Sequence, residues 1–320
     1  MKAIVVKEFG GPEVLQLANV PEPVPGWDQV VVQLEAIGVN PVDTYIRAGT
    51  YAVKPELPYT PGADGAGVIT ALGDGVTRVR KGQRVYVAGA LHGTYAERAL
   101  CDSSHVHPLP EAVSFAQGAA LGVPYVTAHL GLFFRGHALP GETVLVHGGT
   151  GSVGLATIQL ARAVGLYVLA TGGTERGRQI CREQGAHEVF DHHAPEHLDE
   201  ILHSTAGRGI QLIIEMLANV NLGKILPLLA RGGRAIVIGS RGVAEINPRD
   251  LMVRNADIRG VNLLHTPPEE IARAHAALHA GLENGSLRPV IGREIPLAEA
   301  SKAHKAVMAP GAAGKIILLP

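Results

Sequence analysis

The residues with the clearest chemical meaning in this sequence are glycines spaced for binding a dinucleotide. Gly149, Gly151 and Gly154 form a GxGxxG pattern directly after the apolar run at residues 144–146. Such glycines allow a tight turn in which backbone amides approach a pyrophosphate. Small and apolar residues at helical spacing follow, so a helix N-terminus would direct its free amides at the phosphate. The pattern therefore predicts a strand, a turn and a helix that together bind a dinucleotide.

The end of the second predicted strand indicates which dinucleotide is bound. In folds of this type a carboxylate there binds the ribose of NAD, whereas basic residues accommodate the additional phosphate of NADP. Residues 171–174 read TGGT without a carboxylate, and Arg176 and Arg178 follow. Glu175 suits the first turn of a capped helix. NADPH is therefore the expected cofactor, with Arg176 and His192 as predicted contacts; the alternative for the arginines is a solvated helix face.

No pair of a nucleophile and a base is visible, which suits an enzyme whose cofactor performs the chemistry. Asn40, Tyr45 and Tyr51 lie in a loop-rich stretch, and their amide and phenol groups could orient a carbonyl; the alternative for the tyrosines is a place in the core. The fifteen histidines do not show the spacing of a zinc site. Cys101 and Cys181 lie far apart, which argues against a disulfide framework or a zinc lobe. We expect no metal.

Length and composition indicate a globular protein of two domains. The chain has 320 residues, of which 46% are hydrophobic and 18% are charged. No apolar run is long enough for a membrane helix, and the N-terminus lacks the pattern of a signal peptide, so we expect a cytoplasmic protein. The 28 basic and 29 acidic residues nearly balance, which makes nucleic acid improbable as the primary partner.

The first part of the chain, to residue 121, has the short extended runs and turn residues of a partly closed β-barrel. Its predicted strands lie at residues 2–6, 29–36, 66–72 and 84–87, with one short helix at residues 42–48. A helical stretch at residues 119–135 then leads into alternating strands and helices, which require a doubly wound parallel sheet. These strands are predicted at residues 144–146, 167–170, 188–190, 210–215, 234–238 and 257–263, and the later helices at residues 175–184, 197–204 and 222–230.

After a helix at residues 268–284, predicted strands at residues 287–295 and 314–320 return to the first domain. The expected division is a β domain of residues 1–121 and 286–320, with a nucleotide-binding domain of residues 122–285 inserted into it. The strand at residues 257–263 would form a sheet edge. Pairing of this edge across a two-fold axis predicts a homodimer, with a homotetramer as the alternative.

A set of motifs spread over the whole chain resembles a known family. The motifs are GVNPVDTYIRAGTY from Gly38, LPYTPGADGAGVI from Leu57, GVPYVTAH from Gly122, VLVHGGTGSVG from Val144, GAHEVFDHH from Gly185, IIEMLANVNL from Ile213 and VIGSRG from Val237. Together they resemble the zeta-crystallin-type quinone oxidoreductases, a zinc-free branch of the medium-chain dehydrogenase/reductase superfamily. One departure lies in the glycine turn, where Ser152 replaces the second glycine of the usual family pattern.

The resemblance implies a GroES-like β domain, a Rossmann domain inserted within it, and NADPH-dependent reduction of quinones in the cleft between them. Zinc-dependent relatives carry Gly-His-Glu where this chain has Gly62-Ala63-Asp64, and they carry a cysteine in the segment where this chain reads GVNPVD. Both expected zinc ligands are therefore missing here. Asn40, Tyr45 and Thr127 would orient the acceptor. The implied cofactor contacts are Tyr45, Thr150, Gly151, Ser152, Val153, Gly173, His192, Asn221, Ser240, Arg241, Val261, Asn262 and Leu263.

Two alternatives remain open at this stage. A reductase of α,β-unsaturated carbonyls or enoyl thioesters could use the same fold, because a fold does not determine its substrate. A nucleotide-linked structural or RNA-binding protein is an alternative of another class, because zeta-crystallin-like chains are associated with lens accumulation and with AU-rich RNA. The sequence leaves open whether one electron or a hydride is transferred.

Overall fold

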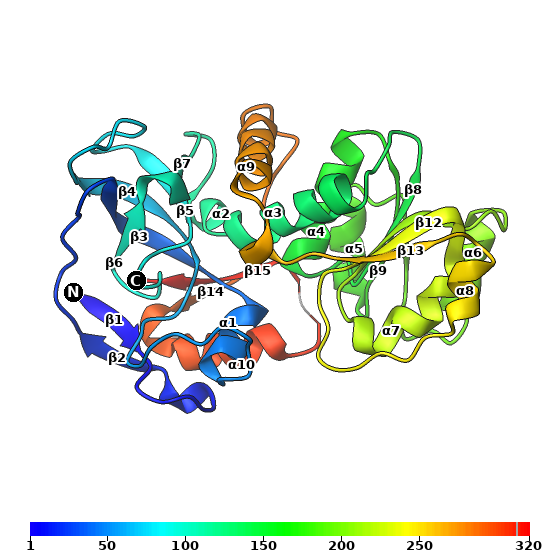
Figure 1. Ribbon diagram of the computed structural model, residues 1–320, viewed down its shortest axis with the longest axis horizontal. Coiled ribbons are helices and arrows are strands. Elements are labelled where there is room, and N and C mark those ends of the chain that lie inside the picture. The colour runs from blue at the N-terminus through cyan, green and yellow to red at the C-terminus, as the bar shows by residue number, and fades with distance from the viewer. Residues whose placement is uncertain (312) are drawn as a thin grey trace. The chain divides into compact units, whose positions relative to one another are not determined.

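The computed structural model describes residues 1–311 and 313–320, which form two compact units (Figure 1). The first unit contains Met1–Val123 and Arg288–Pro320, and the second unit contains Pro124–Leu287. The chain thus begins the first unit, builds the second unit without interruption, and then returns to complete the first. The sequence placed the corresponding boundaries at residues 121 and 286.

The first unit is built on a mainly antiparallel sheet of seven strands that the C-terminus completes. Its strands are β3 (Gln29–Val39), β4 (Asp64–Leu72), β5 (Arg84–Ala88), β6 (Arg98–Asp102), β7 (Val106–Pro108), β14 (Ile291–Pro296) and β15 (Lys315–Leu319). Strand β15, red in Figure 1, pairs antiparallel with β3, so that Ile316 lies opposite Val39. A separate hairpin consists of β1 (Lys2–Val5) and β2 (Gln16–Asn19).

Three helices accompany this sheet: α1 (Pro41–Arg47), α2 (Phe115–Gly118) and α10 (Ala300–Met308). Helix α1 begins where the sequence favours it, because Pro41 suits the first turn and the Asp43 carboxylate accepts the Asn40 N–H at 2.8 Å. Helices α1 and α10 contact each other. The sequence did not predict α10, although it carries a residue of the polar network described below.

The second unit contains a parallel sheet of six strands in the order β10-β9-β8-β11-β12-β13. Its strands are β8 (Thr143–His147), β9 (Tyr167–Thr171), β10 (Glu188–Phe190), β11 (Ile210–Glu215), β12 (Leu229–Val237) and β13 (Asp257–Gly260). Val144, Leu145 and Val146 have no exposed surface, as their continuous apolar run predicts. The strand order reverses between β8 and β11, and such a reversal is where doubly wound sheets bind their ligands.

The helices of the second unit alternate with its strands. They are α3 (Gly122–His129), which begins at the border of the units, a π-helical segment (Leu130–Arg135), α4 (Ser152–Ala163), α5 (Glu175–Glu183), α6 (His197–Ser204), α7 (Ala218–Ile225), α8 (Pro248–Met252) and α9 (Pro268–Glu283). Within the described residues, no helix combines the length and apolar character needed to cross a membrane.

Several predicted element boundaries were wrong, among them that of the strand predicted at residues 234–238, which begins at Leu229. The helix predicted at residues 222–230 begins at Ala218 and ends at Ile225, because Pro227 follows and Leu229 already pairs in the sheet. The strand predicted at residues 257–263 ends at Gly260, because the Asn262 side chain caps a 3-10 turn by accepting the Leu264 N–H. The strand predicted at residues 287–295 begins only at Ile291, since Leu287 bonds back to the end of α9.

Candidate functional site

The glycines between β8 and α4 have different structural tasks. Gly148 has φ of +89°, a backbone conformation that favours glycine. A Cβ at Gly154 would lie 2.6 Å from the carbonyl oxygens of Gly148 and Gly149, so α4 packs directly on the turn. A Cβ at Gly151 would meet no described atom within 4 Å. Gly148 and Gly154 therefore shape the turn, whereas Gly151 leaves the outer side of the turn open.

The N-terminus of α4 suits an anion. Its N-cap residue is Gly151, which has no side chain to cap the helix. Among the described residues, the N–H groups of Ser152, Val153 and Gly154 have no hydrogen-bond partner, and the first bond is from Leu155 N–H to Gly151 O. Free amides and the helix dipole together favour a phosphate. The turn therefore fits the pyrophosphate of a dinucleotide.

The predicted cofactor residues of the second unit follow the carboxyl ends of all six parallel strands. They are Thr150, Gly151, Ser152 and Val153 after β8, Gly173 and Arg176 after β9, His192 after β10, Asn221 after β11, Ser240 and Arg241 after β12, and Val261, Asn262 and Leu263 after β13. Residues far apart in the sequence are thus gathered at one edge of one sheet. This is the edge at which open α/β sheets bind ligands. Their individual contacts to a cofactor stay predictions.

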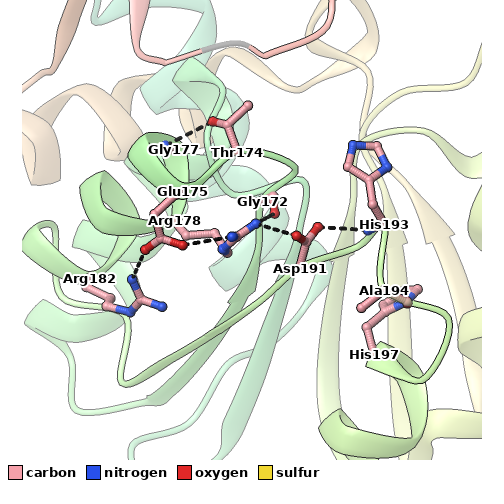
Figure 2. A network of polar contacts seen from close by, with 10 residues as sticks. All are labelled: Gly172, Thr174, Glu175, Gly177, Arg178, Arg182, Asp191, His193, Ala194 and His197. Atoms are coloured by element: carbon pink, nitrogen blue, oxygen red, sulfur yellow. Dashed lines mark hydrogen bonds and ion pairs between the residues drawn. The ribbon is translucent and has the colours of Figure 1, made fainter.

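The two arginines after β9 are not equivalent. The Arg178 guanidinium donates to Glu175 at 2.7 Å, to Asp191 at 2.7 Å and to the Gly172 carbonyl at 3.2 Å (Figure 2). Within the described chain, the exposed Arg176 side chain has no hydrogen bond or ion pair. Arg178 is thus already paired with two carboxylates, whereas Arg176, the predicted cofactor contact, is exposed and its role stays a prediction.

Two histidines lie over the turn that follows β9. A Cβ at Gly173 would be 2.6 Å from His192 Nε2 and 2.7 Å from His193 Nε2. Burial, and then the nearby His193, lower the pKa of His192. Hydrogen bonding by the His193 backbone N–H lowers the pKa of Asp191, which lies between Arg178 and His193 (Figure 2).

A buried carboxylate lies at the carboxyl edge of the sheet, where the strand order reverses between β8 and β11. Glu215 of β11 is fully buried and lies in register with His147 of β8, whose Nδ1 is 2.6 Å from the carboxylate. The second Glu215 oxygen accepts from the Asn221 side chain at 3.1 Å and from the Leu217 N–H. Glu215 therefore orients Asn221, a predicted cofactor contact. The sequence analysis missed this role, although a glutamate ending a buried strand was a usable signal.

In the first unit, the predicted catalytic residue Asn40 is buried among charged groups. Its Oδ1 accepts from Lys315 Nζ at 2.6 Å, and its Nδ2 donates to Asp64 at 2.9 Å. Lys315 and Asp64 form an ion pair at 3.0 Å with side chains 1% and 0% exposed. An ammonium group thus binds Asp64, in the segment where the resemblance implies Gly-His-Glu in zinc-dependent relatives, and Asn40, in the segment where it implies a cysteine. The described residues contain no cluster of three or more His, Cys, Asp or Glu suited to a metal.

A second chain of hydrogen bonds runs through α1 and has a defined direction. Arg47 Nη1 lies 3.3 Å from His304 Nδ1, and because a guanidinium can only donate, this nitrogen accepts. His304 Nε2 then carries the hydrogen of the neutral ring and donates to the Tyr95 hydroxyl at 3.1 Å. Tyr95 in turn donates to Asp43 at 3.2 Å. Burial raises the pKa of Asp43 to about 7 and lowers that of His304 to about 3.

The other two predicted catalytic residues belong to different units. Tyr45 is half-buried on α1, the helix that Asn40 and Asp43 anchor. Thr127 is buried on α3 of the second unit. Their roles toward an acceptor stay predictions.

The architecture and the open glycine turn define a two-domain, dinucleotide-dependent oxidoreductase. Residues 26–111 match the family described as alcohol dehydrogenase GroES-like domain. Residues 152–280 match the family described as zinc-binding dehydrogenase. These matches confirm the predicted fold class, a Rossmann domain inserted into a GroES-like β domain, and place the chain in the medium-chain dehydrogenase/reductase superfamily.

Comparison with individual proteins narrows this class. The chain is 51% identical to human quinone oxidoreductase over 321 residues, covering 100% of this chain and 98% of that protein. A mycobacterial structure complexed with NADPH is 32% identical with a TM-score of 0.91, and both chains are covered completely. Escherichia coli quinone oxidoreductase complexed with NADPH is 27% identical with a TM-score of 0.89 over the full length of both. The chain belongs to the quinone oxidoreductase (zeta-crystallin) family, as its motifs indicated.

Proposed function

We propose that this protein catalyses the NADPH-dependent reduction of quinones. The observation that carries the proposal is the uncapped glycine turn at the carboxyl edge of the parallel sheet, in a chain that is 51% identical to a quinone oxidoreductase over its whole length. Bound NADPH supplies the reducing equivalents. The chain supplies binding and orientation, since no nucleophile is required for such a reaction.

The residues at the sheet edge would hold the cofactor. The free amides of Ser152 and Val153 would bind the pyrophosphate, and Asn221, oriented by Glu215, would bind farther along the edge. Tyr45 and Thr127 would orient the quinone, with the half-buried Tyr45 hydroxyl as the first group to test. Asn40 has both amide atoms bonded to Lys315 and Asp64, so it would act by positioning helix α1. We propose that no catalytic zinc takes part, because Lys315 already neutralises Asp64 and binds Asn40.

The experiment is oxidation of NADPH and, separately, NADH by the purified protein with an ortho-quinone, a para-quinone and an enal. We expect rapid oxidation of NADPH with a quinone, unchanged by a metal chelator. Tyr45→Phe should lower kcat/KM by about tenfold, the usual effect of losing one hydrogen bond to substrate. Unchanged turnover in both Tyr45→Phe and Asn40→Ala would contradict the assignment of these residues.

The same assay separates the two alternative functions. Reduction of the enal without reduction of quinones would favour a reductase of unsaturated carbonyls or enoyl thioesters. NADPH binding without turnover, together with tight and salt-sensitive RNA binding, would favour the structural or RNA-binding alternative.

We further propose a cytoplasmic homodimer. The free cysteines, Cys101 and Cys181, are both buried, which is compatible with a reducing compartment. Strand β13 is the last strand of its sheet, and Met252, just before it, is 72% exposed. Pairing of two β13 strands would cover open backbone groups and this apolar surface. Light scattering coupled to size-exclusion chromatography should give twice the chain mass; four times that mass would indicate the tetramer.

A further inference from the structure

The Asp64 carboxylate binds the beginnings of two helices. Its Oδ1 accepts the Val123 N–H at 2.8 Å, in the first turn of α3, where a backbone N–H has no partner within the helix. Its Oδ2 accepts from the Asn40 side chain at 2.9 Å, and Asn40 is the N-cap residue of α1. Both donors belong to the first unit. One carboxylate therefore fixes where α1 and α3 begin.

A cation holds this carboxylate in place. Lys315 Nζ lies 3.0 Å from Asp64 Oδ2, and the two side chains are 1% and 0% exposed. The same ammonium donates to Asn40 Oδ1 at 2.6 Å. Charge-assisted hydrogen bonds are roughly twice as strong as neutral ones. Because Lys315 is the first residue of β15, the ion pair ties the C-terminal strand to the beginnings of both helices.

Two glycines leave the space that this arrangement needs. A Cβ at Gly38 of β3 would lie 2.8 Å from Asp64 Cβ and 2.8 Å from Lys315 Cε. The same Cβ would lie 2.1 Å from the Ala119 carbonyl oxygen. A Cβ at Gly122, the first residue of α3, would lie 2.3 Å from Asp64 Oδ1. Neither glycine has a positive φ, so close packing, and not backbone conformation, makes a side chain costly at these two positions.

Each of the two helices carries a side chain that is predicted to orient the acceptor. Tyr45 lies on α1, five residues after Asn40, and Thr127 lies on α3, four residues after Val123. Residues of one helix keep fixed positions relative to its first turn. A shift at the beginning of either helix would therefore displace the side chain that the helix carries. A displacement of about 1 Å in a positioning group can lower a rate by roughly a hundredfold.

We propose that Asp64 is a positioning residue for the acceptor, which sets Tyr45 through α1 and Thr127 through α3. This inference rests on the proposed function, because that function assigns these two side chains to the acceptor. Loss of the Asp64 carboxylate should impair reduction of the quinone. It should leave the affinity for NADPH unchanged, because the glycine turn lies between β8 and α4 of the second unit.

The experiment compares two double variants that remove both charges together, so that no buried charge is left without a partner. In the unanchored variant, Asp64→Ala with Lys315→Met, nothing replaces the carboxylate. In the amide variant, Asp64→Asn with Lys315→Met, the new amide can accept the Val123 N–H and donate to Asn40 Oδ1. For the quinone, kcat/KM should fall about tenfold or more in the unanchored variant and largely recover in the amide variant.

The Kd for NADPH, measured by calorimetry, should stay within about twofold in both variants, since distant sites act independently. A loss of quinone reduction that merely follows a loss of NADPH binding would overturn the inference. Equal kcat/KM in the unanchored variant and the unsubstituted protein would overturn it as well.

The response to Tyr45→Phe separates positioning from a merely structural role. In the unsubstituted protein this substitution should lower kcat/KM by about tenfold. In the unanchored variant it should cost less than about twofold, because the hydroxyl is already displaced and the two effects are not additive. A loss of about tenfold in both backgrounds would show that Asp64 does not act through Tyr45, and would overturn the inference.

Amide hydrogen exchange tests the same inference without turnover. Exchange in α1 and α3 should be faster in the unanchored variant, whereas exchange in α4 should not change. Gly122→Ala keeps both charges and would displace Asp64 Oδ1 from Val123. Exchange at the Val123 amide should therefore rise in this variant while exchange in α1 stays the same. If the unanchored variant does not fold, Gly122→Ala decides alone, and unchanged exchange at Val123 would overturn the inference.

Failure of the proposed function looks different. If the unsubstituted protein reduces no quinone, the proposed function is wrong, and hydrogen exchange alone decides whether Asp64 fixes the two helices. Faster exchange in both helices of the unanchored variant would then support the inference, and unchanged exchange would overturn it. If the quinone is reduced equally well with and without the carboxylate, the function stands and the inference is wrong.

Discussion

The members of the two hydrogen-bonded networks next to α1 in the first unit are buried and paired with one another, whereas many polar groups at the carboxyl edge of the second unit have no partner in the described chain. Asp64 and Lys315 are almost completely buried, and every charged atom of this pair has a partner. At the edge of the parallel sheet, Ser152 and Val153 keep free amides, and Arg176 is exposed and unpaired. The polar groups of the first region therefore stabilise the fold, whereas those of the second region are available to bind a ligand.

This difference teaches how each region should respond to substitution. Removing one member of a buried pair leaves the other charge uncompensated in a medium of low dielectric constant. Removing a side chain at the open edge leaves no buried charge without a partner, so the unfolding free energy should change little. Substitutions in the buried networks next to α1 should therefore act mainly on stability, and substitutions at the edge mainly on cofactor affinity.

The largest effect is expected for Lys315→Met, which leaves the Asp64 carboxylate buried without its cation. The free energy of unfolding should fall by about 3 to 5 kcal/mol, measured by urea denaturation. Lys302→Met is the matched control, because Lys302 and Glu299 form an ion pair with side chains 71% and 41% exposed. That control should lose less than about 1 kcal/mol. Equal losses in the two variants would show that the buried pair has no special importance.

A smaller effect is expected for Tyr95→Phe, which removes the hydroxyl between His304 and Asp43. Each neighbour loses a buried hydrogen-bond partner, so the free energy of unfolding should fall by about 1 to 3 kcal/mol. Tyr167→Phe serves for comparison, because its hydroxyl bonds Glu188 at the surface and should contribute less than about 1 kcal/mol. Thermal unfolding of both variants tests the difference.

The glycines of the turn should separate stability from binding within one motif. Gly154→Ala places a methyl group against two carbonyl oxygens and should cost about 1 to 3 kcal/mol of unfolding free energy. Gly151→Ala has room for its methyl group and an extended backbone with φ of −78°. Its stability should stay within about 0.5 kcal/mol, while the Kd for NADPH rises. Equal cofactor affinity in Gly151→Ala and the unsubstituted protein would place the phosphate elsewhere.

The smallest effect is a dependence of stability on pH. Asp43 has a pKa of about 7 in the folded protein instead of the ordinary 3.8, so its contribution is present at low pH and is lost as the pH rises through 7. His304, with a pKa of about 3 instead of 6.5, acts in the opposite direction and loses its contribution as the pH falls below 6.5. Between pH 4 and pH 6.5 the two groups change the unfolding free energy in opposite directions. Just above pH 6.5, only Asp43 still changes it.

The unfolding free energy should therefore decline from pH 6.5 to pH 7, by no more than about 1.4 kcal/mol per pH unit. Asp43→Asn, which keeps an oxygen to accept from Tyr95, should abolish this decline. A decline that persists in the variant would assign it to another group.

The sequence predicted the second unit better than the first. The bounds predicted for the strands at residues 188–190 and 210–215 and the helix at residues 197–204 coincide with β10, β11 and α6. Regular alternation of buried strands and helices is a local signal, so it can be read without knowing what each segment packs against. In the first unit, α10 was missed although its buried residues Ala300, Ala303 and His304 have helical spacing, because alanines and a histidine give only a weak apolar signal.

The sequence alone determined the backbone of the cofactor turn, because glycine spacing and a preceding apolar strand act over a few residues. Only the tertiary structure decided which charges are available. It paired Lys315 with Asp64, far apart in the sequence, and it brought Asp191 to Arg178 across two adjacent strands. The physical reason is that the energy of a charged side chain depends on its burial and its partners, and both are set by contacts between distant segments. The glycine turn could be read from the chain, whereas the neutralised arginine and the buried lysine could not.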